Sequence, residues 1–256
     1  MGDMMLRNAS PSEDYARRLA RARNKGPSND TIFDRHESLR NAATIDDVTG
    51  LLLSSDRDLV ISSLWLLGRL GGRVAARALR SFVNSAAETK LQELALESLG
   101  HIRLKRNGEF LCRMLESDRD ERVRERAASA LRSQDVTPAM THCLVAVLRN
   151  TSESTFVREM VAEVLLCHPE EATVPALTEA MSDPASSVRY WAISSLSFTH
   201  AFHLIPQLEL IAETDYAEAP EPDFNPPGYV PPRVCEVARE VISKLRFRMN
   251  EDSAVL

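Results

Sequence analysis

The stretch Ser117–Leu131 reads SDRDERVRERAASAL and joins a charged turn to a run with helical spacing. Counting from Val123, apolar residues follow at positions +4, +5 and +8, as Ala127, Ala128 and Leu131. Side chains at these intervals lie on one side of an α-helix. The stretch therefore predicts a polar turn followed by a helix with one buried face, on which small alanines allow a neighbouring helix to approach closely.

The same spacing recurs along the chain at a nearly constant interval. It starts at Leu59, Leu91, Val123, Val157 and Val188, which are 32, 32, 34 and 31 residues apart. A second apolar helical run lies between successive starts, so one period corresponds to one helical hairpin. Periods of roughly 20–50 residues are typical of stacked repeats, which bury their apolar faces only against their neighbours.

Two of these segments, Leu115–Leu131 and Leu177–Leu196, resemble HEAT repeats, in particular the HEAT-like repeats of phycobilin lyases. The pattern D-x-x-x-x-V-R-x-x-A-hydrophobic is complete from Asp118 and from Asp183. The copy at Val157 keeps the Val-Arg pair but lacks the turn aspartate. The resemblance is specific for architecture and says little about function, because one fold serves many functions.

The resemblance covers roughly residues 45–245 and implies an all-α fold, a right-handed α-solenoid of about six HEAT-like helical hairpins. We expect the solenoid to span residues 31–249, between a basic arm at residues 1–30 and a C-terminal tail at residues 250–256. The arm is either a solvated terminus or a handle that folds onto an acidic partner.

The repeat pattern is interrupted by ETDYAEAPEPDFNPPGYVPP, residues 213–232, with six prolines, five acidic residues and no Lys or Arg. Proline at this density prevents a helix. A loop longer than about 12–15 residues inside a compact array is usually functional or disordered. The segment is either an acidic spacer or a loop that contacts a partner, and its aromatic residues favour contact: Tyr216, Phe224 and Tyr229.

An arginine follows the first apolar residue of three repeats, as Arg124, Arg158 and Arg189. One interpretation is a ladder of cations for an anionic ligand. The other is that each arginine pairs with a turn aspartate, such as Asp118 or Asp183, and ties neighbouring repeats together. The family pattern implies the second interpretation.

The overall charge does not favour nucleic acid or an anionic membrane as a partner. The net charge is −6, whereas proteins that bind these surfaces usually carry a basic face. The most basic stretch, Arg103–Arg126, contains eight Lys or Arg but also six Asp or Glu. No apolar run approaches the ~18 residues of a membrane span. We therefore expect no membrane association and a cytoplasmic protein.

No motif for nucleotide binding, hydrolysis or redox chemistry is present, so we expect no catalytic residues and no cofactor. The four cysteines lack the CxxC spacing of metal sites and are typical of reduced core thiols. His142–Cys143 and Cys167–His168 are adjacent pairs. Neighbours on a helix point about 100° apart, so such a pair seldom chelates through both side chains. We expect no metal.

The sequence thus predicts a non-enzymatic scaffold or adaptor that binds a protein partner. In this family second helices line the concave surface, and aromatic and Arg side chains are enriched at interfaces. The predicted contacts are Arg122, Glu125, Arg126, Tyr190, Tyr216, Phe224 and Tyr229. The resemblance leaves two alternatives: a phycobilin-lyase-like chromophore-handling protein and a HEAT-like DNA-binding or repair protein. No small-molecule ligand is indicated.

Overall fold

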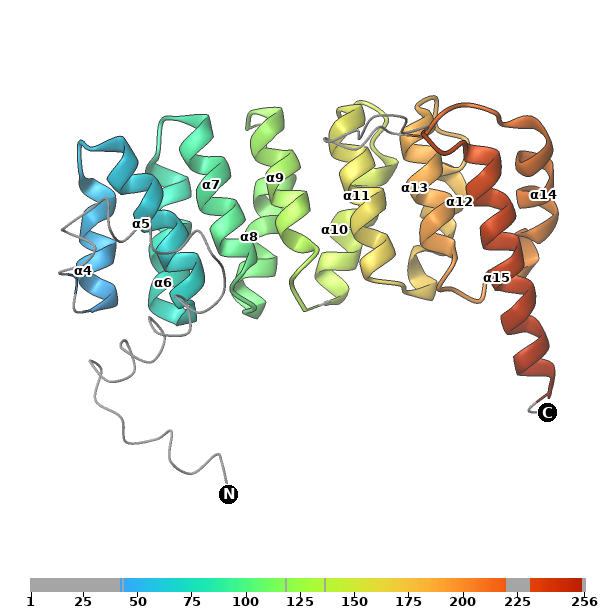
Figure 1. The fold of residues 1–256 in the computed structure, drawn as a ribbon, viewed down its shortest axis with the longest axis horizontal. Helices are drawn as coiled ribbons and strands as arrows, with labels where there is room; N and C mark the ends of the chain where they lie inside the picture. The colour runs from blue at the N-terminus through green and yellow to red at the C-terminus, as the bar shows by residue number, and fades with distance from the viewer. Residues whose placement is uncertain (1–41, 43, 118, 136, 220–230, 255–256) are drawn as a thin grey trace, which may run out of the picture. The chain divides into compact units, whose positions relative to one another are not determined.

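The computed structural model describes residue 42 and residues 44–117, 119–135, 137–219 and 231–254. These residues form helices joined by short turns, with no strand among them (Figure 1). The fold is the all-α helical solenoid that the sequence predicted, and the described helices follow one another as six hairpins. The predicted basic arm lies outside the described residues.

The chain divides into two compact units, which we call unit 1 and unit 2. The described residues of unit 1 are in the ranges 42–114 and 119–135, and those of unit 2 are in the ranges 115–117 and 137–254. The helices of unit 1 are α4 (Ile45–Gly50), α5 (Arg57–Leu70), α6 (Gly72–Ser85), α7 (Thr89–Gly100), α8 (Lys105–Leu115, whose last residue is grouped with unit 2) and α9 (Glu121–Leu131). A short 3-10 turn, η2 (Leu51–Leu53), follows α4.

Unit 2 repeats the hairpin arrangement. Its helices are α10 (Pro138–Arg149), α11 (Thr155–Cys167), α12 (Val174–Ala180), α13 (Ser186–Leu196), α14 (Ile205–Thr214) and α15 (Val234–Ala254). Short 3-10 turns lead into α12 and α14, as η3 (Glu171–Thr173) and η4 (Phe202–Leu204). The last helix continues past residue 249, where the sequence predicted the end of the solenoid.

Side-chain oxygens mark the start of many of these helices. Asp56 accepts hydrogen bonds from the N–H groups of Asp58 and Leu59 at the start of α5, at 3.0 and 3.2 Å. Thr137 accepts from the Met140 N–H at the start of α10, at 3.2 Å. These caps satisfy N–H groups that have no partner within the helix, so the turn residues fix where each helix begins.

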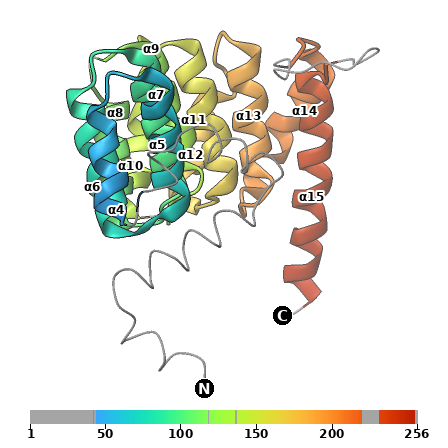
Figure 2. The same ribbon diagram turned by 60° about the vertical axis from the view of Figure 1, so that its left-hand side comes forward.

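The second helices of the hairpins pack against one another within each unit. In unit 1, α5 contacts α7 and α7 contacts α9; in unit 2, α11 contacts α13 and α13 contacts α15 (Figures 1 and 2). The first apolar residues of the repeats are buried in these contacts, namely Leu59, Val123, Val157 and Val188. Leu91, which matches only the apolar pattern, is half-buried.

Glycine allows the second helices of unit 1 to approach closely. A Cβ atom on Gly68 of α5 would lie 2.8 Å from the carbonyl oxygen of Ser98 on α7. A Cβ atom on Gly100 of α7 would lie 3.1 Å from the Cβ of Ala130 on α9. Both glycines follow the first apolar residue of their repeat by nine positions. Two successive repeats therefore make the same close contact between second helices.

The two ends of the predicted loop 213–232 are bonded to each other through their backbones. The Ala219 N–H donates to the Pro232 carbonyl at 2.7 Å, and the Val234 N–H donates to the Ala217 carbonyl at 2.9 Å. We call this paired segment, residues 215–219 with 231–235, the loop base. Residues 220–230, which include two of the predicted contact aromatics, Phe224 and Tyr229, lie outside the described residues.

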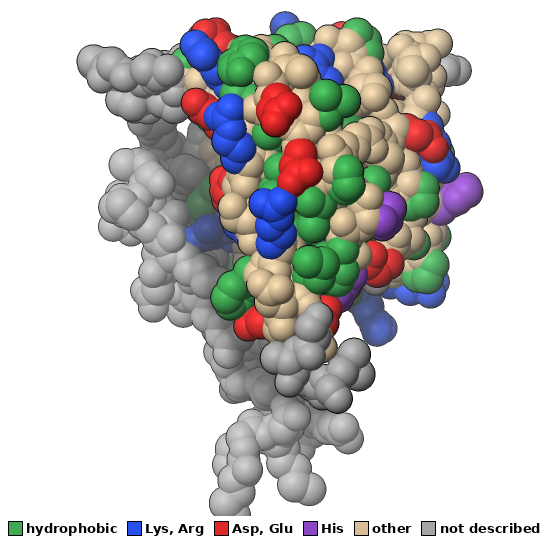
Figure 3. Space-filling model, turned by 90° about the vertical axis from the view of Figure 1, so that its right-hand side faces the viewer, with side chains coloured by type: hydrophobic (Ala, Val, Ile, Leu, Met, Phe, Trp, Pro, Cys, Tyr) green, Lys and Arg blue, Asp and Glu red, His purple; other side chains and the backbone are tan. Residues whose placement is uncertain are grey.

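The C-terminal hairpin presents a surface of mixed polarity. Acidic and basic side chains are interspersed over this end of unit 2 (Figure 3). On α15, Lys244 pairs with Glu240 at 2.6 Å, and Arg246 pairs with Glu209 of α14. Exposed apolar side chains lie among these charges, Leu210 on α14 and Phe247 and Met249 on α15.

Candidate functional site

Two arginines that follow a repeat's first apolar residue join consecutive repeats of unit 2. Arg158 on α11 is buried and forms an ion pair with Asp183, in the turn before α13. One repeat later, Arg189 on α13 donates from Nε and Nη2 to the carboxylate of Asp215, at 2.7 and 3.1 Å. We call these two pairs the Arg–Asp joints. They confirm the interpretation that these arginines tie repeats together.

Each of these arginines also caps the turn of its own repeat. Arg158 Nε donates to the carbonyl of Glu153 at 3.2 Å, and Arg189 Nη1 donates to the carbonyl of Asp183 at 2.8 Å. In α7 of unit 1 the same position holds Gln92, whose Nε2 donates to a turn carbonyl at 2.5 Å. In these three repeats, the side chain that follows the first apolar residue therefore donates a hydrogen bond to a backbone carbonyl of its own turn.

Arg124 on α9 also donates a hydrogen bond to a carbonyl of its own turn. Its Nη1 donates to the carbonyl of Arg119 in the preceding turn. Asp118, the partner that the sequence suggested, lies outside the described residues.

Asp215 links a joint to the loop base. Burial raises the pKa of its carboxyl, but hydrogen bonds from Arg189 and from the Ala217 N–H, together with the charge of Arg189, outweigh burial and leave the pKa below its usual value. The Asp215 carbonyl also accepts from the Cys235 N–H at 2.8 Å. One residue thus connects α13, α15 and the loop base.

The predicted contact residues of α9 lie on one exposed side of that helix in unit 1. Arg122 is exposed, and Glu125 and Arg126 are half-exposed. Arg126 Nη1 lies 3.7 Å from Glu97 Oε2 on α7. The structure therefore groups these three residues into a surface of mixed charge on the second helices.

The predicted aromatic contacts of unit 2 are on α13 and on the loop base. Tyr190 and Trp191 are both half-exposed, with ring centroids 5.2 Å apart at an interplanar angle of 86°. Tyr216 is 56% exposed on the loop base. The sequence-based set omitted Trp191, although an adjacent Tyr-Trp pair in a chain with 5% aromatic residues marks the position.

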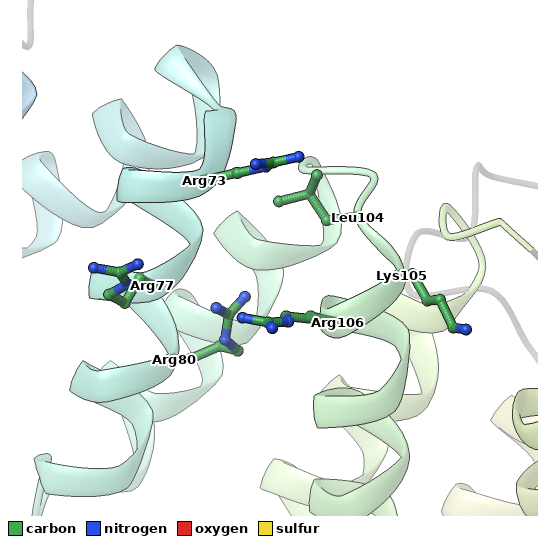
Figure 4. A pocket seen from close by; sticks show the side chains of 6 residues that line it. All are labelled: Arg73, Arg77, Arg80, Leu104, Lys105 and Arg106. Atoms are coloured by element: carbon green, nitrogen blue, oxygen red, sulfur yellow. The ribbon is translucent and has the colours of Figure 1, made fainter.

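A hollow of about 430 Å³ lies in unit 1 between α6 and the start of α8. We call it the basic hollow. Its lining consists of Arg73, Arg77, Arg80, Leu104, Lys105 and Arg106. The guanidinium groups of Arg80 and Arg106 point toward each other, the side chain of Arg73 extends toward Leu104, and Lys105 points away from the rest (Figure 4).

The cations of the basic hollow have no carboxylate partners among the described residues. Burial lowers the pKa of Arg80, and the charges of Arg106, Arg77 and Arg113 lower it further. Arg80 Nη1 donates to the side-chain oxygen of the fully buried Asn107. The guanidinium of Arg80 is therefore held in place by a neutral amide while its charge remains uncompensated.

The basic hollow was not predicted from the sequence, because its residues do not belong to one continuous basic stretch such as Arg103–Arg126. That stretch included α9, whose acidic residues balance its arginines. The basic hollow instead combines α6 with α8, one repeat later. Its signal was present: residues 59–87 contain four arginines and no acidic residue, and Arg73, Arg77 and Arg80 are spaced i, i+4 and i+7 along one helix face.

The family assignment rests on two overlapping matches to the family model described as HEAT repeats. They cover residues 48–132 and 108–197, which together exceed half of the chain. The chain belongs to the HEAT-repeat family. The described hairpins within residues 48–197 are HEAT repeats, and repeats of this kind generally mediate protein interactions.

Two solved structures resemble this HEAT-repeat chain. The complex of CpcE and CpcF of phycocyanin lyase from Nostoc sp. PCC7120 has a TM-score of 0.51 at 21% identity, covering 66% of this chain and 70% of that chain. The YibA protein of E. coli has a TM-score of 0.47 at 16% identity, covering 94% and 98% of the two chains. No curated protein matches the chain. At these identities the likeness to the lyase complex shows the fold alone.

The cysteines of the HEAT repeats are mostly in the core. Cys112, Cys143 and Cys235 are buried as predicted, whereas Cys167 is exposed at the end of α11, so the prediction of a core thiol is wrong there. Among the described residues, no group of three or more His, Cys, Asp or Glu side chains is placed to hold a metal ion. None of the described helices is long and apolar enough to cross a membrane.

Proposed function

We propose that this HEAT-repeat chain is a non-enzymatic adaptor that binds a protein partner through the exposed sides of its second helices and through the loop 213–232. The observation that carries the proposal is the half-exposed pair of Tyr190 and Trp191 on α13. An edge-to-face aromatic pair offers a large contact area in a fixed geometry, and such residues dominate the energetics of protein interfaces. The core of this chain is mainly aliphatic, so packing does not require two rings at this surface.

The mixed charge on α9 supports the same proposal. Arg122, Glu125 and Arg126 present both signs within two turns of one helix. Protein interfaces surround an apolar centre with a polar rim, and charges of both signs on that rim select a complementary partner. A surface of this kind suits a folded protein, which carries charges of both signs, better than a polymer whose charges all have the same sign.

The loop base is a further proposed contact, on unit 2. Tyr216 stands on a backbone that is fixed by hydrogen bonds on both sides, from the Cys235 N–H to the Asp215 carbonyl and from the Val234 N–H to the Ala217 carbonyl. An exposed ring on a fixed backbone loses little conformational entropy on binding. This placement supports a contact role for the loop.

Three carboxyl groups belong to structural ion pairs. Glu88 and Glu179 have lowered pKa values because each accepts hydrogen bonds from an arginine, Arg57 and Arg149 respectively. Asp215 has a lowered pKa for the reason given above. We therefore do not include these carboxylates among the proposed partner contacts.

The proposal is tested by affinity capture from a lysate of the native host, with quantitative mass spectrometry of the captured proteins. Wild-type protein is compared with the double variant Tyr190→Ala/Trp191→Ala and with the control Leu210→Ala. Leu210 is 61% exposed on α14, a first helix, so its truncation removes exposed apolar surface outside the proposed interface. We expect one partner to be lost at least tenfold from the double variant only. Equal capture by both variants, with circular dichroism showing both folded, contradicts the proposal.

The part played by the loop is tested separately. The triple variant Tyr216→Ala/Phe224→Ala/Tyr229→Ala is compared with wild type for its affinity for the captured partner. We expect weaker binding, and an unchanged affinity excludes the loop from the interface. The chromophore-handling alternative is checked by absorbance after addition of a free bilin, and the DNA-binding alternative by a gel shift at low salt. A coloured complex or a shifted band would replace the adaptor proposal.

A further inference from the structure

We propose that the basic hollow binds a small anion that carries at least two phosphate groups. The site is separate from the proposed protein interface, because α6 and α8 are first helices whereas the protein contacts lie on second helices and on the loop. The two proposals therefore stand or fall independently.

The charge of the lining is the first argument. Five of the six lining residues are Lys or Arg and none is acidic. The chain as a whole carries a net charge of −6, so this concentration of positive charge does not reflect the composition. Like charges this close repel one another, and an anion in the hollow relieves the repulsion.

The fixed position of Arg80 is the second argument. Its guanidinium is bound to the side-chain oxygen of Asn107, and Asn107 Nδ2 donates to the Ile102 carbonyl at 2.7 Å. Asn107 is fully buried, so this chain of hydrogen bonds anchors Arg80 to the interior of unit 1. A binding group that is already positioned loses less entropy when the ligand arrives.

The facing guanidinium groups of Arg80 and Arg106 indicate the class of anion (Figure 4). A carboxylate carries one negative charge and leaves one of the two arginines uncompensated. A phosphate group carries about −1.5 to −2 charges and three acceptor oxygens, which match the donor geometry of arginine. Arg73 and Arg77 extend the same lining, so full compensation requires a second phosphate group.

The size and polarity of the hollow indicate a small ligand. Its volume of about 430 Å³ lies within the range of about 300–1,000 Å³ that is typical of small-molecule sites. Leu104 is the one apolar residue in the lining. A ligand with a large apolar body would leave these cations desolvated and unpaired, whereas a compact polyphosphate satisfies them.

The test is isothermal titration of the full-length protein with sodium tripolyphosphate at constant, near-physiological ionic strength. The variants are Arg106→Glu and Arg77→Glu/Arg106→Glu, both at exposed positions. The control is Arg246→Glu, which makes the same charge change at an exposed arginine of α15 that does not line the hollow. Circular dichroism and thermal melting verify that each variant is folded.

We expect wild type and Arg246→Glu to bind tripolyphosphate with similar affinity. Arg106→Glu should weaken binding by at least about tenfold, because a charge-assisted hydrogen bond is lost and a repulsion replaces it. The double variant should show no heat of binding. Capture of the protein partner by Arg106→Glu should equal that of wild type, which separates this site from the adaptor interface.

Four outcomes overturn the proposal. Wild type shows no binding, or Arg246→Glu loses as much affinity as Arg106→Glu, which indicates general attraction to the molecule. Inorganic phosphate binds as tightly as tripolyphosphate, which removes the need for two phosphate groups. An octaglutamate peptide binds more tightly than tripolyphosphate, which identifies an acidic protein segment as the occupant.

Discussion

The two units join their repeats by different means. In unit 2 the second helices are tied by the Arg–Asp joints, one buried at Arg158–Asp183 and one partly exposed at Arg189–Asp215. In unit 1 the second helices meet where Gly68 and its counterpart one repeat later allow close backbone approach.

Backbone carbonyls accept the long polar side chains of unit 1. Gln134 Nε2 donates to the Gly100 carbonyl at 2.9 Å, and Arg119 Nη1 donates to the Val83 carbonyl at 3.0 Å. Both bonds connect one repeat to the preceding one without a buried ion pair. The described residues of unit 1 also form ion pairs between consecutive repeats, Arg57–Glu88 and Arg126–Glu97, but these lie at the surface, whereas the Arg158–Asp183 pair of unit 2 is buried.

The arginines of the Arg–Asp joints and those of the basic hollow differ in whether a carboxylate lies within reach. Arg158 and Arg189 follow a first apolar residue and meet an aspartate in the next turn, so their charges are compensated within the protein. Arg73, Arg77 and Arg106 lie on first helices, where the described chain offers them no carboxylate. The presence or absence of a carboxylate within reach, and not the number of arginines, distinguishes the two sets; Arg149 of the first helix α10 has such a partner in Glu179.

The largest effect should follow from breaking the buried joint of unit 2. Asp183→Ala leaves the Arg158 guanidinium buried without a counter-charge, which should destabilise the protein by about 3–5 kcal/mol. Asp183 Oδ1 also accepts from the Ala185 N–H at 2.9 Å, so a turn is lost as well. Urea denaturation measures the change in the free energy of unfolding.

Asp183→Asn is the matched control for this change. The amide oxygen still accepts the Ala185 N–H, so this variant isolates the charge and should be less destabilising than Asp183→Ala. If both variants unfold at the wild-type urea concentration, the joint does not hold the repeats together.

A smaller loss of stability should follow from adding a Cβ atom where the second helices of unit 1 approach closely. Gly68→Ala places a Cβ atom against the backbone of Ser98, which cannot move without shifting α7, and should cost about 1–3 kcal/mol. Gly50→Ala is the control, because a Cβ there would meet no atom within 4 Å. We expect Gly50→Ala to leave the urea midpoint unchanged or slightly raised. Equal effects of the two substitutions would show that close approach is not what joins unit 1.

The partly exposed joint, Arg189–Asp215, should contribute less to the stability of the protein in acid. The folded-state pKa of Asp215 lies below the unfolded value of about 3.9, so its contribution is present above that pH and is lost as the pH falls through the folded pKa. At pH 7 Asp215→Asn should cost about 1 kcal/mol, since the pair is partly exposed. The difference in urea midpoint between wild type and Asp215→Asn should shrink below about pH 4. A constant difference down to pH 2 would assign the effect to packing.

The smallest effect, with the opposite sign, should follow from neutralising an arginine of the basic hollow. Arg106→Gln removes a like charge that faces Arg80, so stability should stay constant or rise by about 0.3 kcal/mol in the absence of ligand. Arg189→Gln, which breaks a joint, should instead lower stability. Thermal melts of both variants at low salt compare the two signs directly. If both variants melt at a lower temperature than wild type, the arginines of the basic hollow stabilise the fold, as those of the joints do.

Most of the fold was predictable from sequence because each repeat buries the same positions. The interval from Val123 to Val157 and Val188 fixed the hairpins, and the Val-Arg pairs indicated the joints. The sequence did not show that Arg158 and Arg189 reach the aspartate of the following turn, because that pairing depends on how successive repeats stack.

The candidate sites were predictable only in part. Tyr190 was predicted as a contact because an aromatic residue on a second helix stands out in an aliphatic chain, and Trp191 beside it was left out of the predicted set. The basic hollow was missed because its arginines come from two helices whose proximity is set by stacking. Sites built within one helix were visible in sequence, and the site built between helices of successive repeats was not.

The loop base joins the two ends of the segment that lies between α14 and α15. Because Ala219 and Pro232 are bonded to each other, and Val234 begins the last helix on the far side of that bond, the intervening residues enter and leave the hairpin at one point. Their length and sequence can change without altering the path of α14 or α15. An engineered sequence can therefore replace this segment while the backbone hydrogen bonds of the loop base stay the same.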